Sequence, residues 1–107
     1  MRDTSPMQES LLLANLGFYD SAIPEPLMDY LRSLLQTAMA NLESCGVKVD
    51  TENLEDALLS VMYAAWLYRC GPSGGAMPPM LSSAIRNRQV ALAIERGGQP
   101  REAAPSV

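Results

Sequence analysis

The chain contains no histidine, only two cysteines and few aromatic residues. Without histidine it lacks the side chain whose ordinary pKa best suits proton transfer near neutral pH, and the commonest neutral ligand of transition metals. Cys45 and Cys70 form no CxxC or zinc-type spacing, and such sparse cysteine is typical of free thiols in a reducing compartment. We therefore expect no catalytic residues, no metal site and no cofactor.

Basic charge is also scarce, with eight Lys and Arg against twelve Asp and Glu and a net charge of −4. This acidic balance argues against sequence-independent binding to nucleic-acid phosphates and against binding to an anionic membrane. The longest apolar run covers residues 61–68 and is too short to cross a bilayer, which needs about 20 residues. The first ten residues lack a signal-peptide pattern. These absences predict a soluble intracellular protein.

Apolar residues are plentiful, at 48 % of the chain, and most are the helix formers Leu, Ala and Met. A chain of 107 residues has room for one domain. We therefore predict an all-α fold, a small four-helix bundle over residues 1–96. Residues 97–107 are polar and rich in Pro and Gly, which predicts a flexible C-terminal tail.

Capping residues and apolar spacing predict the four helices. Ser5 and Gln8 have the spacing of a capping box around Pro6, which predicts a first helix over 6–16 that stops at Gly17. Leucines at steps of three and four predict a second helix over 25–44 that ends before Gly46. A third helix is predicted over 54–68, and a fourth from Pro78-Pro79 to Gly97-Gly98.

The entrance to the third helix is acidic. Asp50 or Thr51 is the predicted N-cap, and Glu52, Glu55 and Asp56 follow it. Acidic side chains in a first turn oppose the positive end of the helix dipole. We therefore interpret them as solvent-facing residues of the helix surface, not as a catalytic carboxylate pair.

The third helix is apolar around nearly its whole circumference. A helix of this kind must be buried on more than one side. In so short a chain the other helices can cover only part of it, so we expect the remainder to meet another subunit. The apolar positions are Leu54, Ala57, Leu58, Leu59, Val61, Met62, Tyr63, Ala64, Ala65, Trp66 and Leu67.

Eight residues are candidates for a subunit or partner interface. Trp66, with Tyr63 and Tyr68, is either a core residue or an interface anchor. Met77 and Met80 either fill the core or form an adaptable contact.

The other three candidates are basic. Arg86 and Arg88 form the most concentrated basic spot, which Arg69 would join if the intervening loop folds back. They lie either on a solvated helix face or in an ion-pair bridge to a neighbour's acidic helix, such as the one that starts at Glu52 and Glu55.

A resemblance to a known family covers residues 62–93 most clearly and about 8–93 in layout. The residues that carry it are the helix MYAAWLYR at 62–69, a glycine-bearing loop at 70–76, the segment MPPML at 77–81, and Asn87-Arg88. In their order and spacing these elements resemble the head–tail connector (adaptor) proteins of long-tailed bacteriophages.

The resemblance implies a structural protein of the virion, not an enzyme. Members of this family are small helical proteins that form a ring, commonly of twelve copies, at the neck of the virion after synthesis in the host cytoplasm. The ring lies between the portal protein and the head-completion (stopper) or tail-side protein, and DNA passes through its lumen. By this resemblance the partners are other copies of the chain, the portal protein and a completion protein.

Two other functions use the same features of the sequence. A small regulatory module would sequester a protein factor through an apolar helical groove. A helix-turn-helix DNA-binding domain would place its turn at about residues 44–54, but the following helix begins with acidic residues that repel phosphates. The stoichiometry of the complex separates the regulatory module from the virion protein.

Overall fold

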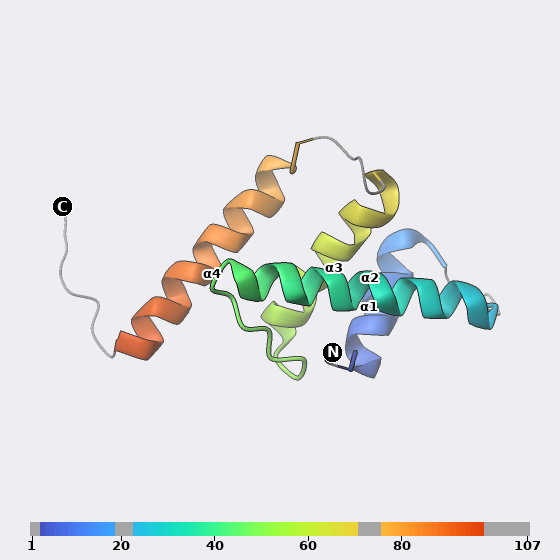
Figure 1. Cartoon of the computed structure of the whole chain (residues 1–107), viewed down its shortest axis with the longest axis horizontal. Helices are drawn as coiled ribbons and strands as arrows, with labels where there is room; N and C mark the ends of the chain where they lie inside the picture. The colour runs from blue at the N-terminus through green and yellow to red at the C-terminus, as the bar shows by residue number, and fades with distance from the viewer. Residues whose placement is uncertain (1–2, 19–22, 71–75, 98–107) are drawn as a thin grey trace.

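The computed structural model describes residues 3–18, 23–70 and 76–97, and within them it contains four helices and no strand (Figure 1). They are α1 (Pro6–Leu16), α2 (Glu25–Ser44), α3 (Leu54–Cys70) and α4 (Pro79–Gly97). The predicted all-α, four-helix class is confirmed, and the predicted helix ends agree to within two residues. The predicted tail beyond Gly97 and residues 71–75 of the glycine-rich loop lie outside the described residues.

Local chemistry begins α1 and ends both α1 and α2 as predicted. The Ser5 hydroxyl accepts from the Gln8 backbone N–H, and the Gln8 side chain accepts from the Ser5 N–H, which completes the capping box. Gly17 follows α1 with φ of 88°, and Gly46 follows α2 with φ of 91°. Both conformations are left-handed, where a side chain would be strained.

The cap of α3 differs from the prediction. Asn53 is the capping residue, because its side-chain oxygen accepts from the Asp56 backbone N–H at 3.1 Å. Asp50 instead accepts from the Glu52 N–H at 3.0 Å, which stabilises the turn before the helix. Asp50, Thr51 and Asn53 can each cap a helix, and only the path of the chain decided which of them does so.

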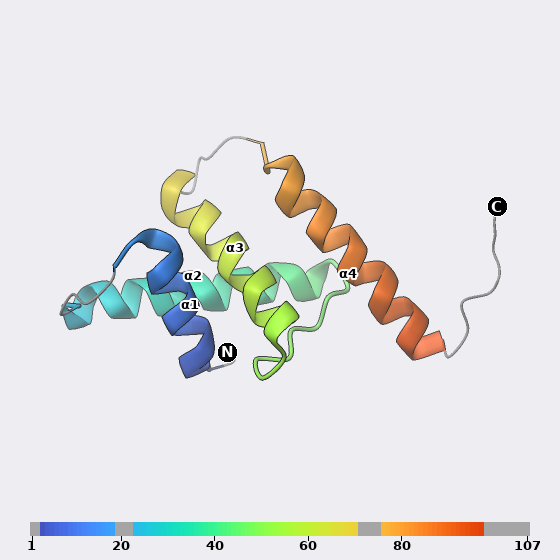
Figure 2. The same cartoon turned by 180° about the vertical axis from the view of Figure 1, so that it is seen from behind.

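The third helix lies at the centre of the molecule. Helices α1 and α2 make most of the contacts with α3, and α4 makes fewer. In Figure 2, α1, α3 and α4 lie side by side in that order, and α2 crosses behind them. The C-terminal half of α4 extends past the other three helices in both views (Figures 1 and 2). No helix in the described part of the chain combines the length and the hydropathy needed to cross a membrane.

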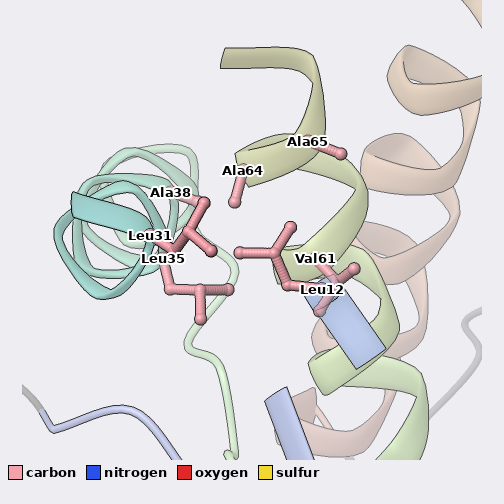
Figure 3. Close-up of a cluster of buried hydrophobic side chains, with 7 residues drawn as sticks. All are labelled: Leu12, Leu31, Leu35, Ala38, Val61, Ala64 and Ala65. Atoms are coloured by element: carbon pink, nitrogen blue, oxygen red, sulfur yellow. The ribbon is translucent and has the colours of Figure 1, made fainter. Parts of the chain in front are cut away.

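Two apolar clusters hold these helices together. The first lies where α2 crosses α1 and α3, and Figure 3 shows Leu31, Leu35 and Ala38 of α2 pointing at Val61 and Ala64 of α3. The second joins the end of α2, the connection after it, α3 and α4. Its buried members are Met39, Leu42, Val47, Val49, Leu59, Leu81 and Ile85.

One polar side chain is buried among these apolar residues. Gln8 is fully buried, and its amide donates to the Ser60 hydroxyl at 2.8 Å and to the Met39 sulfur at 3.4 Å. The Ser60 hydroxyl in turn donates to the Ala57 carbonyl. Each polar group is satisfied, so Gln8 links α1 to α3 without an unpaired buried donor.

We expect Gln8→Glu to lower the free energy of unfolding by about 2–4 kcal/mol at pH 7. A glutamate retains the acceptor for the Ser5 N–H but places a carboxylate against Ser60. Burial raises the pKa of such a group above its ordinary value of about 4.3. The deficit relative to wild type should therefore be small below about pH 4 and grow as the pH rises. Urea unfolding of both proteins at pH 4 and pH 7 measures it.

Gln8→Met is the control, because it removes the polar group without adding a titratable one. Its difference from wild type should be the same at both pH values. An equally pH-independent difference for Gln8→Glu would contradict the buried hydrogen bond to Ser60.

Candidate interaction surface

The chain covers only part of α3. Ala57, Leu59, Val61, Ala64 and Ala65 are buried in the two clusters. Leu54 and Leu58 are 56 % and 41 % exposed, and Met62, Tyr63, Trp66, Leu67 and Tyr68 are partly exposed. Helix α3 therefore presents apolar side chains to solvent, and Leu58, Met62 and Trp66 do so on the side that faces α4.

This exposed side forms a groove between α3 and α4. Two hollows of about 320 Å³ each lie end to end, and both are lined by Met62. We call them together the α3–α4 groove. One half is lined by Glu55, Leu58, Leu59, Met62, Ala84, Asn87, Arg88 and Ala91. The other half is lined by Asn15, Met62, Ala65, Trp66, Arg69, Cys70, Pro78, Met80 and Leu81.

The three predicted aromatic anchors do not form one cluster. The rings of Tyr63 and Trp66 meet edge to face with centroids 5.6 Å apart, and both pack against the second apolar cluster. Trp66 also lines the groove, so it has both a core role and a surface role. Tyr68 lies instead beside Tyr30 of α2 at 6.2 Å. Tyr30 is an exposed aromatic residue that the spacing of α2 gave no reason to select.

The two predicted methionines lie in different environments. Met77 is partly buried and packs against the second cluster, as expected for core filling. Met80 is 76 % exposed and lines the groove. A solvent-exposed methionine beside an apolar hollow is typical of an adaptable binding surface.

Arg88 binds acidic residues of its own chain. Its Nε donates to the Asp56 carboxylate at 2.6 Å, and its second contact is with Glu55 at 3.5 Å. The interpretation of Asp56 as a surface acid was wrong, since its side chain is 1 % exposed and also accepts from the Asp50 N–H. The ion pair between Arg88 and the acidic start of α3 therefore forms within one chain. The sequence had suggested a neighbouring subunit as one possible source of the acidic partner.

This ion pair is a structural link between α3 and α4. The hydrogen bond that Arg88 donates to the Asp56 carboxylate raises the pKa of Arg88 above its ordinary value, despite the opposing effect of burial. A raised arginine pKa adds stability that is lost only in strong alkali, so Arg88 itself stays charged at neutral and moderately alkaline pH. Gln89 adds a second link, because its amide donates to the Cys45 carbonyl at the end of α2 at 2.6 Å.

The other two arginines lie apart. Arg69 donates to the Asn15 carbonyl at 3.0 Å, near the end of α1, so it does not join Arg86 and Arg88 in one basic patch. Arg86 is exposed and forms no ion pair with any other described residue. Of the three predicted basic residues, Arg86 alone retains its full capacity to bind a partner.

The described residues hold no group of three Cys, Asp or Glu side chains placed to bind a metal ion. Comparisons with protein-family models, with curated proteins and with solved structures find no match to this chain.

We expect Arg88→Met to lower the free energy of unfolding by about 3–5 kcal/mol, because it leaves the buried Asp56 carboxylate without its charged partner. The methionine retains most of the apolar stem, so the loss reports the ion pair more than the packing. Chemical unfolding followed by circular dichroism measures it.

Arg86→Met is the matched control, two residues earlier on the same helix, and should change stability by less than about 0.5 kcal/mol. The double variant Asp56→Asn with Arg88→Met should recover part of the loss, since it no longer buries a bare charge. Equal losses for Arg86→Met and Arg88→Met would contradict this assignment.

Proposed function

We propose that the chain is a structural adaptor of a bacteriophage virion, which assembles into a ring beneath the portal and joins the head to a tail-side completion protein. It has no catalytic role, and DNA passes through the lumen of the ring without specific binding. The observation that carries the proposal is the apolar side of α3 that the chain leaves uncovered. Covering such a surface is the largest general source of association free energy.

The residues that carry the resemblance to connector proteins also surround the groove. Met62, Trp66 and Arg69 come from the helix motif, Pro78, Met80 and Leu81 from the MPPML segment, and Asn87 and Arg88 from the last helix. Segments separated in sequence by the glycine-rich loop thus line one surface. This convergence supports a role for the motif in binding rather than in folding alone.

The charge of the chain fits a channel for DNA. A net charge of −4 gives a ring with a repulsive electrostatic effect on phosphates. A lumen rich in Lys and Arg would bind the phosphate backbone and slow its passage. The acidic balance therefore supports passage without retention.

A helix-in-groove regulatory module remains a competing proposal, because an apolar groove along two helices also suits a single amphipathic helix of another protein. The two functions differ in stoichiometry. A ring requires many copies of this chain in one particle, whereas a sequestering module forms a one-to-one complex with its target.

The direct test measures the mass of the purified chain by light scattering, alone and with the portal protein of the same phage. The proposal expects a homo-oligomer in at least one of the two samples and several copies in purified virions. A chain that remains a monomer with portal at high concentration, or that is missing from virions, would contradict it.

We expect Leu58→Gln to leave the chain folded and to weaken assembly by about tenfold or more. Leu58 is exposed in the groove, so its loss costs the monomer little, whereas each buried leucine contributes about 1.5–3 kcal/mol to an interface. Light scattering over a dilution series measures assembly, and circular dichroism checks the fold. Ala40→Gln, at an exposed position of α2, is the control and should assemble as wild type does.

A further inference from the structure

The outward face of α4 carries apolar residues that the described part of the chain leaves exposed. Val90 and Ile94 are 54 % and 44 % exposed. With Arg86 they lie one turn apart on one face of the helix, since positions four residues apart are neighbours along an α-helix. The residues that attach α4 to the rest of the molecule, Leu81 and Ile85, lie on the opposite face. We call Arg86, Val90 and Ile94 the outer stripe.

Two of the three stripe residues, Val90 and Ile94, lie in the C-terminal half of α4. The C-terminal half of α4 extends beyond α1, α2 and α3 in both views (Figures 1 and 2). A chain cannot fill its own groove with this stripe, because another face of the same helix already forms the groove wall through Ala84 and Ala91. The stripe and the groove are therefore two separate apolar surfaces of one subunit.

Charge links these two surfaces. Arg86, at one end of the stripe, has no acidic partner among the described residues. At the α3 entrance, the groove is bordered by Glu55, whose side chain is 79 % exposed, and Glu52, which is also exposed, lies three residues earlier in the turn before the helix. Arg88 contacts Glu55 only at 3.5 Å and directs its short hydrogen bond to Asp56. Glu55 and Glu52 at this end of the groove can therefore pair with a second cationic side chain.

We propose that the outer stripe of one copy docks in the α3–α4 groove of a second copy, with Val90 and Ile94 against Leu58 and Met62 and with Arg86 beside Glu55 and Glu52. This interface rests on the proposed assembly of the chain with itself and specifies its two sides. Because the sides differ, each docked copy still presents a free groove and a free stripe. Such head-to-tail contacts build rings or filaments, whereas a symmetric contact would stop at a dimer.

The test reverses the charges separately and together. Arg86→Glu and Glu55→Lys should each weaken assembly by about tenfold or more, because each places like charges face to face. The double variant should assemble as wild type does. An equimolar mixture of the two single variants should also assemble, since every contact in an alternating particle then joins opposite charges. Light scattering over a dilution series measures all four samples.

Two controls accompany these variants. Lys48→Glu makes the same charge change at an exposed residue of the connection between α2 and α3 and should not alter assembly. Circular dichroism should show wild-type helix content for every variant, since Arg86 and Glu55 are exposed. Ile94→Asp tests the apolar part of the same interface. It should abolish assembly although Arg86 and Glu55 are both unchanged.

Several outcomes would overturn the inference. If wild type assembles and the single variants assemble equally well, the interface lies elsewhere and the proposed function stands. The same holds if the single variants fail and neither the double variant nor the mixture recovers, because the two charges then do not meet. If the variants assemble normally but lose portal binding, the groove takes the portal instead of a second copy. A wild-type chain that never assembles, even with portal, removes both proposals.

Discussion

The structure depends on how much of one apolar helix three short helices can cover. Close-packed helices lie about 8–10 Å apart, so enclosing a helix on all sides takes about six neighbours. Helix α3 has α1 and α2 in close contact and α4 in looser contact. Its side toward α2 is buried in two clusters, and its opposite side lies open as a groove. The exposed leucines of α3 follow directly from this shortage of neighbours.

The same shortage explains the polar links of α4. This helix contributes few residues to the apolar core, chiefly Leu81 and Ile85, and is held in addition by the ion pair of Arg88 with Asp56 and by the hydrogen bond of Gln89 to Cys45. Polar links of this kind are directional, so they define the position of α4 where apolar packing alone would allow it to slide. The groove keeps its shape because one of its walls is attached in this way.

The proposed assembly through such a surface would make binding and folding separate properties. Core residues such as Leu35 and Val61 decide whether the chain folds, and groove residues such as Leu58 and Met80 contribute little to the monomer. Trp66 is the exception, because it packs against the core and lines the groove at once. Substitutions on the groove therefore separate the two properties more cleanly than substitutions at the tryptophan.

The sequence by itself determined the class, number and ends of the helices, because caps, glycines and apolar spacing act over a few residues. The capping box at Ser5 and the left-handed Gly17 and Gly46 are examples. The spacing of apolar residues along the sequence also predicted that α3 has more apolar surface than its neighbours can bury. Only the tertiary structure decided which acid is buried, which tyrosine meets Trp66 and which of Arg69, Arg86 and Arg88 has no partner among the described residues. Those outcomes depend on contacts between residues far apart in the chain, such as Arg88 with Asp56, and short-range patterns carry no information about them.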